Sequence, residues 1–315
     1  MEFPHTACLG GGVIGASWAA LFLASGRTVA LYDPDPDIAR KVRAYVARAW
    51  PVLDALGLTE NSSPEAITFH GSAADAVDGA HFVQENVPER LAIKHATFSE
   101  IEPALAPDAI VASSASGLML SQMQDGWRDP GRFVLGHPFN PPHLVPLVEV
   151  LGNAATDPAA VAAAERFYAS VGKVTIRLNK EKNGHVANRL QAALWREAVS
   201  LVVDGVASVE DVDKAIWAGP GLRWAAMGPT MLFHLGAGEG GLRAFCEHFS
   251  DTFDGWWNEL GDVRLTPEVA DQLVQGIADT TSDDTIALSQ RRDAMIVAMR
   301  QAIEPLRTGG PADRE

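Results

Sequence analysis

The sequence has little cysteine. Cys8 and Cys246 are the only two cysteines among 315 residues, and both stand in apolar surroundings far apart in the chain. Two distant cysteines cannot supply the disulfide framework of a small secreted domain, so we expect free thiols in a reducing cytoplasm. The nine histidines form no H-x-x-x-H or similar ligand cluster, and no metal site is expected.

Long apolar runs and an excess of positive charge are also missing. No apolar run has the length needed to span a bilayer, so no membrane association is expected. The first predicted strand begins at Thr6, close to Met1, so we expect no signal or transit peptide. The 40 acidic residues outnumber the 25 basic ones and give a formal net charge of −15, which argues against nucleic acid as a partner. The remaining composition, 47% hydrophobic and 21% charged, is typical of a globular protein.

The N-terminus carries a glycine-rich turn between a strand and a helix. A short apolar strand, Thr6–Leu9, leads into Gly10–Gly15, which fits the pattern G-x-G-x-x-G. An apolar helix over Val13–Ala24 follows, then a second strand, Thr28–Tyr32, with Asp33 at its carboxyl end. Strand, glycines, helix, strand and acid in this order predict a dinucleotide-binding Rossmann fold.

Each glycine of the turn has a physical task in such a site. Gly10 permits the tight turn, Gly12 lets the backbone approach a pyrophosphate, and Gly15 lets helix and strand pack closely. The first helical turn, which includes Val13 and Ile14, offers unpaired N–H groups and a positive dipole end to the phosphates.

The acid after the second strand indicates which dinucleotide binds. Asp33 follows Gly10 by 23 positions, where a carboxylate accepts hydrogen bonds from the ribose hydroxyls and repels a 2′-phosphate. FAD-dependent chains usually need more sequence than this to cover their cofactor. The predicted cofactor is therefore NAD.

A second informative segment pairs a histidine with a glutamate. The strands Phe133–His137 and Leu147–Leu151 flank a proline-rich turn, and a hairpin centred near His143 would set His137 opposite Glu149. Cross-strand partners approach within roughly 5 Å, close enough for a carboxylate to orient an imidazole. By itself the pair fits either a proton-transfer site or a buried histidine held by a structural acid.

The rest of the chain divides into two halves, an α/β Rossmann domain over residues 1–179 with a mostly parallel sheet and an all-helical domain over residues 180–315. Further strands of the first half are predicted at 67–69, 81–84, 110–113 and 174–178, and helices at 37–56, 73–77, 89–102 and 159–171, with Ser72 and Asp157 as caps. Helices of the second half are predicted at 184–204, 209–216, 229–249 and 267–306, and the tail from about Arg307 is expected to be disordered.

The motifs together resemble the 3-hydroxyacyl-CoA dehydrogenase family. The family's His-x-Phe-Asn-Pro segment matches residues 137–141, its glutamate matches Glu149, its serine matches Ser116, and its Asn-Arg-Leu triplet begins at Asn188. The resemblance covers nearly the whole chain. It implies a Rossmann domain followed by a helical dimerisation domain, a homodimer, and NAD-dependent oxidation of a 3-hydroxy group. It further implies that His137 is the catalytic base, that Glu149 orients it, and that Ser116 and Asn188 hydrogen-bond the substrate oxygen.

Three segments resemble more closely the branch of the family that contains carnitine dehydrogenases and lambda-crystallin, a gulonate dehydrogenase: residues 84–90, 195–198 and 221–229. In that branch Glu89 and Lys94 would contact the nicotinamide half of NAD. Asn140 would order the proline-rich loop or touch the cofactor. Two positions depart from the pattern, since Asn188 stands where carnitine enzymes tend to carry Asp, and His185 replaces an aromatic or aliphatic residue.

Candidate substrate residues come from the helical half. Trp195 lies seven residues after Asn188, on the same helix face, and Trp195 and Trp224 offer aromatic faces to a quaternary ammonium group. Arg189 and Arg223 are candidates for a substrate carboxylate. The same residue types also serve packing and structural ion pairs, so both interpretations stay open.

The substrate itself is left open among small 3-hydroxy compounds. The candidates are carnitine or a close analogue, an aldonate such as L-gulonate, a longer hydroxy acid, and a 3-hydroxyacyl-CoA thioester. Lys41 is the only lysine between residues 37 and 66 to meet CoA phosphates, which disfavours the thioester. A non-catalytic NAD-binding protein of the crystallin kind is a further alternative. A non-catalytic protein would have no physical reason to retain all four of these residues at their spacings: Ser116, His137, Glu149 and Asn188.

Overall fold

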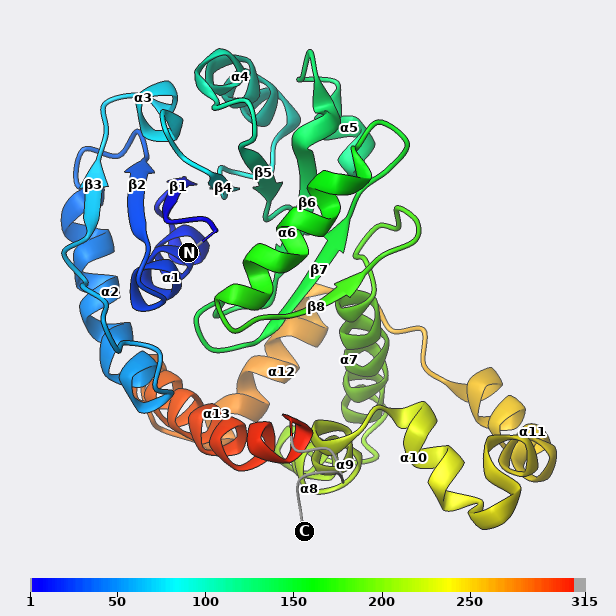
Figure 1. Ribbon diagram of the computed structural model, residues 1–315. Helices are drawn as coiled ribbons and strands as arrows, with labels where there is room; N and C mark the ends of the chain where they lie inside the picture. Colours follow the sequence, from blue (N-terminus) through cyan, green and yellow to red (C-terminus); the bar gives the residue numbers. More distant parts are fainter. Residues whose placement is uncertain (1, 309–315) are drawn as a thin grey trace, which may run out of the picture. The chain divides into compact units, whose positions relative to one another are not determined.

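A computed structural model describes residues 2–308 of the chain. Its first part is an eight-stranded sheet with the order β3-β2-β1-β4-β5-β6-β7-β8 (Figure 1). All neighbouring strands are parallel except β6 and β7, which are antiparallel. The strands are β1 (His5–Leu9), β2 (Thr28–Tyr32), β3 (Ile67–Phe69), β4 (Phe82–Glu85), β5 (Ile110–Ser113), β6 (Phe133–Pro138), β7 (Leu147–Leu151) and β8 (Val174–Arg177). The predicted Rossmann fold with a mostly parallel sheet is confirmed.

Helices cover both faces of this sheet, because its strands are apolar on both sides. In β1, Cys8 faces one hydrophobic cluster while Ala7 and Leu9 face the other, as the two-residue period of a strand requires. One cluster includes residues of α1 (Val13–Ala24), α2 (Ile38–Ala55) and α6 (Pro158–Ser170). The other includes residues of α3 (Ala73–Val77), α4 (Leu91–Ile101) and α5 (Leu120–Gln124).

The predicted caps of two helices are confirmed. The Ser72 side chain accepts a hydrogen bond from the N–H of Asp75, and the Asp157 side chain accepts one from the N–H of Ala159. The helix α5 and the short 3-10 helices at Glu102–Ala104 and Pro130–Arg132 were not predicted. Such short elements offer too few turns for a hydrophobic period to be read.

The second part of the chain is helical, as predicted, but its helices are more numerous and shorter. They are α7 (Ala187–Val203), α8 (Val209–Ala218), α9 (Pro220–Ala226), α10 (Pro229–Gly236), α11 (Gly241–Glu259), α12 (Pro267–Thr280) and α13 (Thr285–Thr308), with a 3-10 turn at Gly238–Gly240. Among residues 2–308, no helix combines the length and the apolar character needed to cross a bilayer.

Three predicted helix boundaries are wrong. A single helix over 229–249 is broken where Gly238 and Gly241 take positive φ angles of 61° and 58°. A single helix over 267–306 is broken at Thr281, whose backbone is extended. Helix α7 begins at Ala187 instead of Gly184, because Gly184 and His185 have positive φ angles of 72° and 50° that no α-helix contains.

The chain forms two compact units. One ends at Val186 and includes the chain again from Gln290, and the other is Ala187–Ser289. The last part of α13 therefore belongs with the sheet, where Gln301 donates to the Ala55 carbonyl at 2.6 Å and Arg300 to the Leu144 carbonyl at 3.1 Å. The predicted functional division into residues 1–179 and 180–315 stays a prediction. The predicted disordered tail is wrong for Arg307, which lies in α13, and its last residues, 309–315, lie outside the described residues.

We expect Gly136→Ala to destabilise the sheet. A Cβ at Gly136 would lie 2.0 Å from the Tyr168 hydroxyl oxygen, and this hydroxyl is buried and donates to Gln84 at 2.7 Å. Forcing an atom into such a site should lower the free energy of unfolding by about 1–3 kcal/mol, measured by urea denaturation. Gly71→Ala is the matched control, since no described atom lies within 4 Å of its added Cβ. Equal stability of the two variants would contradict the account.

Candidate active site

The glycine-rich turn has the shape that a dinucleotide requires. Gly10 takes a φ of +86°, and a Cβ there would lie 2.7 Å from the Asn86 carbonyl oxygen. A Cβ on Gly15 would lie 1.9 Å from the Gly10 carbonyl oxygen, so helix α1 can approach the turn only with glycine there. By contrast, no described atom lies within 4 Å of a Cβ built on Gly12. The turn therefore has an open side at the N-terminus of α1, where no side chain caps the helix and the N–H groups fit a pyrophosphate.

Asp33 stands at the end of β2 beside this turn. One carboxylate oxygen accepts the Gly11 N–H at 2.7 Å, and the other accepts the Asp35 N–H at 2.9 Å. These bonds fix a half-buried negative charge next to the glycines. The position and charge fit a ribose diol and disfavour a 2′-phosphate.

His137 and Glu149 face each other across the antiparallel pair β6 and β7. The strand register matches the two residues directly, and His137 Nδ1 lies 2.7 Å from Glu149 Oε2. The predicted cross-strand placement is confirmed. His137 is 5% exposed and Glu149 fully buried. Because a carboxylate only accepts, Nδ1 carries the proton, and Nε2 is left as the nitrogen that can take a proton from a substrate.

Glu149 also holds the chain before α7. Its second oxygen, Oε1, accepts the Val186 N–H at 2.9 Å. The carboxylate thus orients the imidazole on one side and a backbone segment on the other.

Ser116 lies on the loop after β5, where Glu89 gathers several donors. The Glu89 carboxylate accepts the Ser116 hydroxyl at 2.9 Å and the backbone N–H groups of Ser116 and Leu118, each at 3.0 Å, as well as that of Gly117. Burial tends to raise the pKa of Glu89, but the hydrogen bonds from Gly117 and Ser116 outweigh it and hold the pKa below its usual value. Glu89 is therefore an anion that fixes the loop carrying Ser116.

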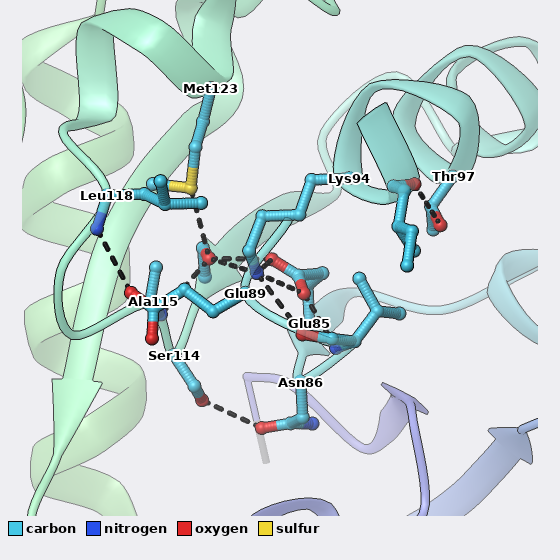
Figure 2. Close-up of polar contacts among 12 residues, drawn as sticks. Glu85, Asn86, Glu89, Lys94, Thr97, Ser114, Ala115, Leu118 and Met123 are labelled. Atoms are coloured by element: carbon cyan, nitrogen blue, oxygen red, sulfur yellow. Dashed lines mark hydrogen bonds and ion pairs between the residues drawn. The ribbon is translucent and has the colours of Figure 1, made fainter. Parts of the chain in front are cut away.

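Lys94 reaches from α4 into the interior instead of to the surface. Its Nζ donates to both oxygens of Glu85 at 2.6 and 2.7 Å (Figure 2). Both side chains are almost fully buried. Ser113 donates to the same carboxylate at 2.6 Å. The contact of Lys94 with the nicotinamide half of NAD stays a prediction, and the amine has a structural partner of its own.

His185 is a residue for which sequence reasoning gave no role beyond a departure from the family pattern. Its ring lies 5.1 Å from the His137 ring, centroid to centroid, and it is 5% exposed. The His185 Nε2 lies 3.3 Å from the Ala115 carbonyl oxygen. Burial is the main cause that lowers the pKa of His185 below its ordinary value. The only sequence signal was this histidine directly after Gly184.

The remaining candidate residues are exposed or half-buried. Asn140 is exposed on the loop after β6. In the second unit, Asn188 is half-buried near the start of α7, and Trp195 on the same helix is 51% exposed. Trp224 on α9 is 38% exposed. Arg189 on α7 and Arg223 on α9 are exposed too. Their predicted roles stay predictions.

The chain combines a glycine turn that fits a pyrophosphate, an acid whose position fits a ribose, and a buried His–Glu pair across the antiparallel strands of a mostly parallel sheet. These features are typical of an NAD-dependent dehydrogenase. Comparison with family models agrees. Residues 5–182 match the 3-hydroxyacyl-CoA dehydrogenase NAD binding domain, and residues 184–275 match the C-terminal domain of the same family. The chain belongs to the 3-hydroxyacyl-CoA dehydrogenase family, and the predicted resemblance and NAD cofactor are confirmed.

Individual relatives are similar over almost the whole chain. An L-carnitine dehydrogenase from Streptomyces griseus is 44% identical over 302 residues, which cover 96% of this chain and 90% of the relative. An L-carnitine dehydrogenase from Pseudomonas putida is 40% identical, covering 96% and 95%. A solved structure of FHMPC 5-dehydrogenase, an NAD+-dependent dismutase acting on a pyridine 4-carboxylic acid, is 30% identical with a TM-score of 0.82, covering 96% and 99%.

We expect Lys94→Met to unfold more easily than the wild-type protein. The change leaves the fully buried Glu85 without its cation, and such uncompensated charges cost about 3–5 kcal/mol in the free energy of unfolding. Urea denaturation measures the loss. The double variant with Glu85→Gln should recover part of it, because the buried charge is removed too. A single variant as stable as the wild type would show that the pair is not formed in solution.

Proposed function

We propose that this protein oxidises the 3-hydroxy group of L-carnitine, or of a close analogue, to the 3-keto compound with NAD. The observation that carries the proposal is the buried His137–Glu149 hydrogen bond of 2.7 Å in an NAD-binding sheet. The choice of L-carnitine as substrate rests on relatives named L-carnitine dehydrogenase, which are 40–44% identical over nearly the full chain.

His137 acts as the general base of this reaction. The substrate hydroxyl donates its proton to Nε2 while the hydrogen on the same carbon leaves with its electron pair and the C=O bond forms. Bound NAD supplies the nicotinamide ring that accepts this hydride. Glu149 holds the imidazole in one tautomer and stabilises the positive charge that the proton brings. The same proton returns to the oxygen in the reverse reaction.

Two further side chains stabilise the substrate oxygen as it loses its proton. Ser116 and Asn188 hydrogen-bond that oxygen, on which negative charge develops. In the structure the single O–H of Ser116 donates to Glu89, so this role requires that hydroxyl to turn from Glu89 to the substrate oxygen, while the backbone N–H groups still bound to Glu89 keep the loop in place. The cofactor is held by the glycine turn and its neighbours: Gly10, Gly12, Val13, Ile14 and Gly15 at the pyrophosphate, Asp33 at the ribose, and Glu89, Lys94 and Asn140 towards the nicotinamide.

The quaternary ammonium group of L-carnitine is met by aromatic faces. Trp195 and Trp224 are exposed within their unit, and each cation–π contact would contribute about 0.5–2 kcal/mol. Arg189 and Arg223 are the candidate partners of the substrate carboxylate on the helical unit.

The protein forms a homodimer through its helical unit. It acts in the cytoplasm. Large apolar side chains are exposed along the helical unit, which is typical of a surface covered by a second copy. Examples are Leu190 (67%), Trp217 (65%), Leu222 (66%) and Trp257 (64%). Sedimentation as a stable monomer at micromolar concentration would contradict this part of the proposal.

The direct test of the substrate follows nicotinamide absorbance when the purified protein meets NAD and four compounds separately. They are L-carnitine, L-gulonate, 3-hydroxybutyrate and 3-hydroxybutyryl-CoA. We expect turnover of L-carnitine. Turnover of the thioester alone would assign the protein to acyl-CoA oxidation instead. No turnover of any of the four compounds, with NAD binding intact, would contradict the proposed substrate.

We expect His137→Ala to lower kcat by about 10²–10⁴-fold, since that is the usual contribution of a general base. Circular dichroism and the dissociation constant for NADH should stay close to wild type. His70→Ala serves as the matched control, because His70 lies after β3 and its side chain is 3.0 Å from the hydroxyl of nearby Thr68, outside the candidate site. Near-normal turnover of His137→Ala would exclude His137 as the base.

We expect Asp33→Ser to relax the choice of cofactor. The wild-type carboxylate repels a 2′-phosphate, so the ratio of kcat/KM for NAD over NADP should fall at least about tenfold when the charge is removed. Steady-state kinetics with both cofactors measure the ratio. An unchanged ratio would show that Asp33 does not meet the ribose.

A further inference from the structure

One buried nitrogen beside the catalytic base lacks a partner. His185 is 5% exposed, and within residues 2–308 its Nδ1 has no hydrogen-bond partner. Nearly all buried polar groups are partnered, so such an atom points to a group that arrives from outside the chain. The other ring nitrogen, Nε2, faces the Ala115 carbonyl at 3.3 Å. Because a carbonyl only accepts, Nε2 carries a proton, and Nδ1 can donate only when the ring is charged.

The backbone fixes this ring next to His137. Gly184 and His185 take left-handed φ angles of 72° and 50°, which residues other than glycine seldom adopt. The following N–H, of Val186, is held by Glu149 Oε1 at 2.9 Å. The carboxylate that orients the base therefore also anchors the turn carrying His185, and the two imidazole centroids lie 5.1 Å apart.

We propose that His185 binds the carboxylate of the substrate and takes up a proton on Nδ1 when the acid binds. The inference rests on the proposed function and extends it. L-carnitine has three polar groups, and its hydroxyl gives its only O–H to His137. The quaternary ammonium group carries no N–H. The carboxylate is the group that remains, and His185 is a candidate partner for it in addition to Arg189 and Arg223. Since a carboxylate only accepts, Nδ1 must donate to it.

The charges around His185 favour this coupling. His137 faces it from β6, Glu149 from β7 and Glu89 from the loop before α4, while the Ala115 carbonyl lies after β5. Burial lowers the pKa of His185 most, the neighbouring His137 lowers it too, and the bond to Ala115 and the two glutamates act in the opposite direction. The ring is therefore neutral in the free enzyme near neutral pH. A bound carboxylate supplies a further negative charge, raises the pKa of His185 and draws a proton.

The substrates named for two relatives both carry a carboxylate, although His185 itself is a departure from the family pattern. L-carnitine is a hydroxy acid, and the substrate in the name of FHMPC 5-dehydrogenase is a pyridine 4-carboxylic acid. The two compounds differ in their ring and their cationic group, and the carboxylate is a feature that they share.

The experiment measures binding of L-carnitine and of L-carnitinamide to the enzyme–NADH complex between about pH 6 and pH 9. The amide keeps the hydroxyl and the ammonium group, so it cancels any titration of His137. For the wild type we expect the ratio of the dissociation constants, L-carnitine over amide, to rise with pH by up to about tenfold per unit. Binding of L-carnitine should also take up a proton, seen by calorimetry in buffers with different ionisation enthalpies.

Two variants separate the carboxylate contact from simple packing. His185→Phe keeps an aromatic ring without the donor, and should raise the KM for L-carnitine about 10–100-fold while kcat changes less than about threefold. His185→Asn keeps an N–H donor near the Nδ1 position, and asparagine tolerates a left-handed backbone. This variant should retain the preference for L-carnitine over the amide but lose its pH dependence. If His185→Phe fails to fold, the pH dependence in His185→Asn decides.

His81→Phe is the matched control. His81 Nδ1 is also buried and unpartnered within the described chain, but the residue precedes β4 and stacks on His5 at 5.4 Å. We expect its binding ratio to equal that of the wild type. Turnover of L-carnitine with a pH-independent ratio in the wild type, or an unchanged ratio in His185→Phe, would overturn the role of His185 alone. Absence of L-carnitine turnover in the wild type would overturn the proposed function itself.

Discussion

The active site depends on one hydrogen bond, between His137 Nδ1 and Glu149 Oε2. It exists because β7 runs antiparallel to β6 in a sheet that is otherwise parallel, and because the register matches these two residues. The bond fixes the imidazole tautomer and leaves Nε2 for chemistry. The other oxygen of Glu149 holds Val186 N–H, so one carboxylate sets both the base and the turn that carries His185.

Around this pair, buried polar groups are satisfied by one another. Lys94 and Ser113 pair with Glu85, and Tyr168 donates to Gln84 at 2.7 Å. These contacts stiffen the ends of β4 and β5, from which the loops at Glu89 and Ser116 follow. Of the four buried side-chain nitrogens that lack a partner within residues 2–308, the one on a ring packed against His137 is His185 Nδ1. Because the neighbouring buried polar groups have hydrogen-bond partners, the unpartnered His185 Nδ1 points to a bound ligand.

The sequence was sufficient for features encoded locally. The strands, the glycine turn and the caps at Ser72 and Asp157 follow from short-range patterns, and the symmetry of the hairpin was enough to pair His137 with Glu149. Contacts between distant segments could not be predicted, such as the hydrogen bonds from the Ser116 loop to Glu89. The break between α10 and α11 lies in a stretch with glycine at positions 236, 238, 240 and 241, and it was missed because the apolar segments on either side were interpreted as one helical pattern. His185 could be identified from the sequence as a departure from the family pattern, but its proposed role depends on its proximity to His137 on β6, which is distant in sequence.

The most direct test of the central claim is a crystal structure of the protein with NADH and L-carnitine bound. The account predicts that the substrate hydroxyl oxygen lies within about 3 Å of His137 Nε2, on the side of the ring away from Glu149. It also requires the substrate carbon to face the nicotinamide. A hydroxyl bound elsewhere, with His137 touching no reacting atom, would contradict the assignment of His137 and Glu149 as the proton-transfer pair.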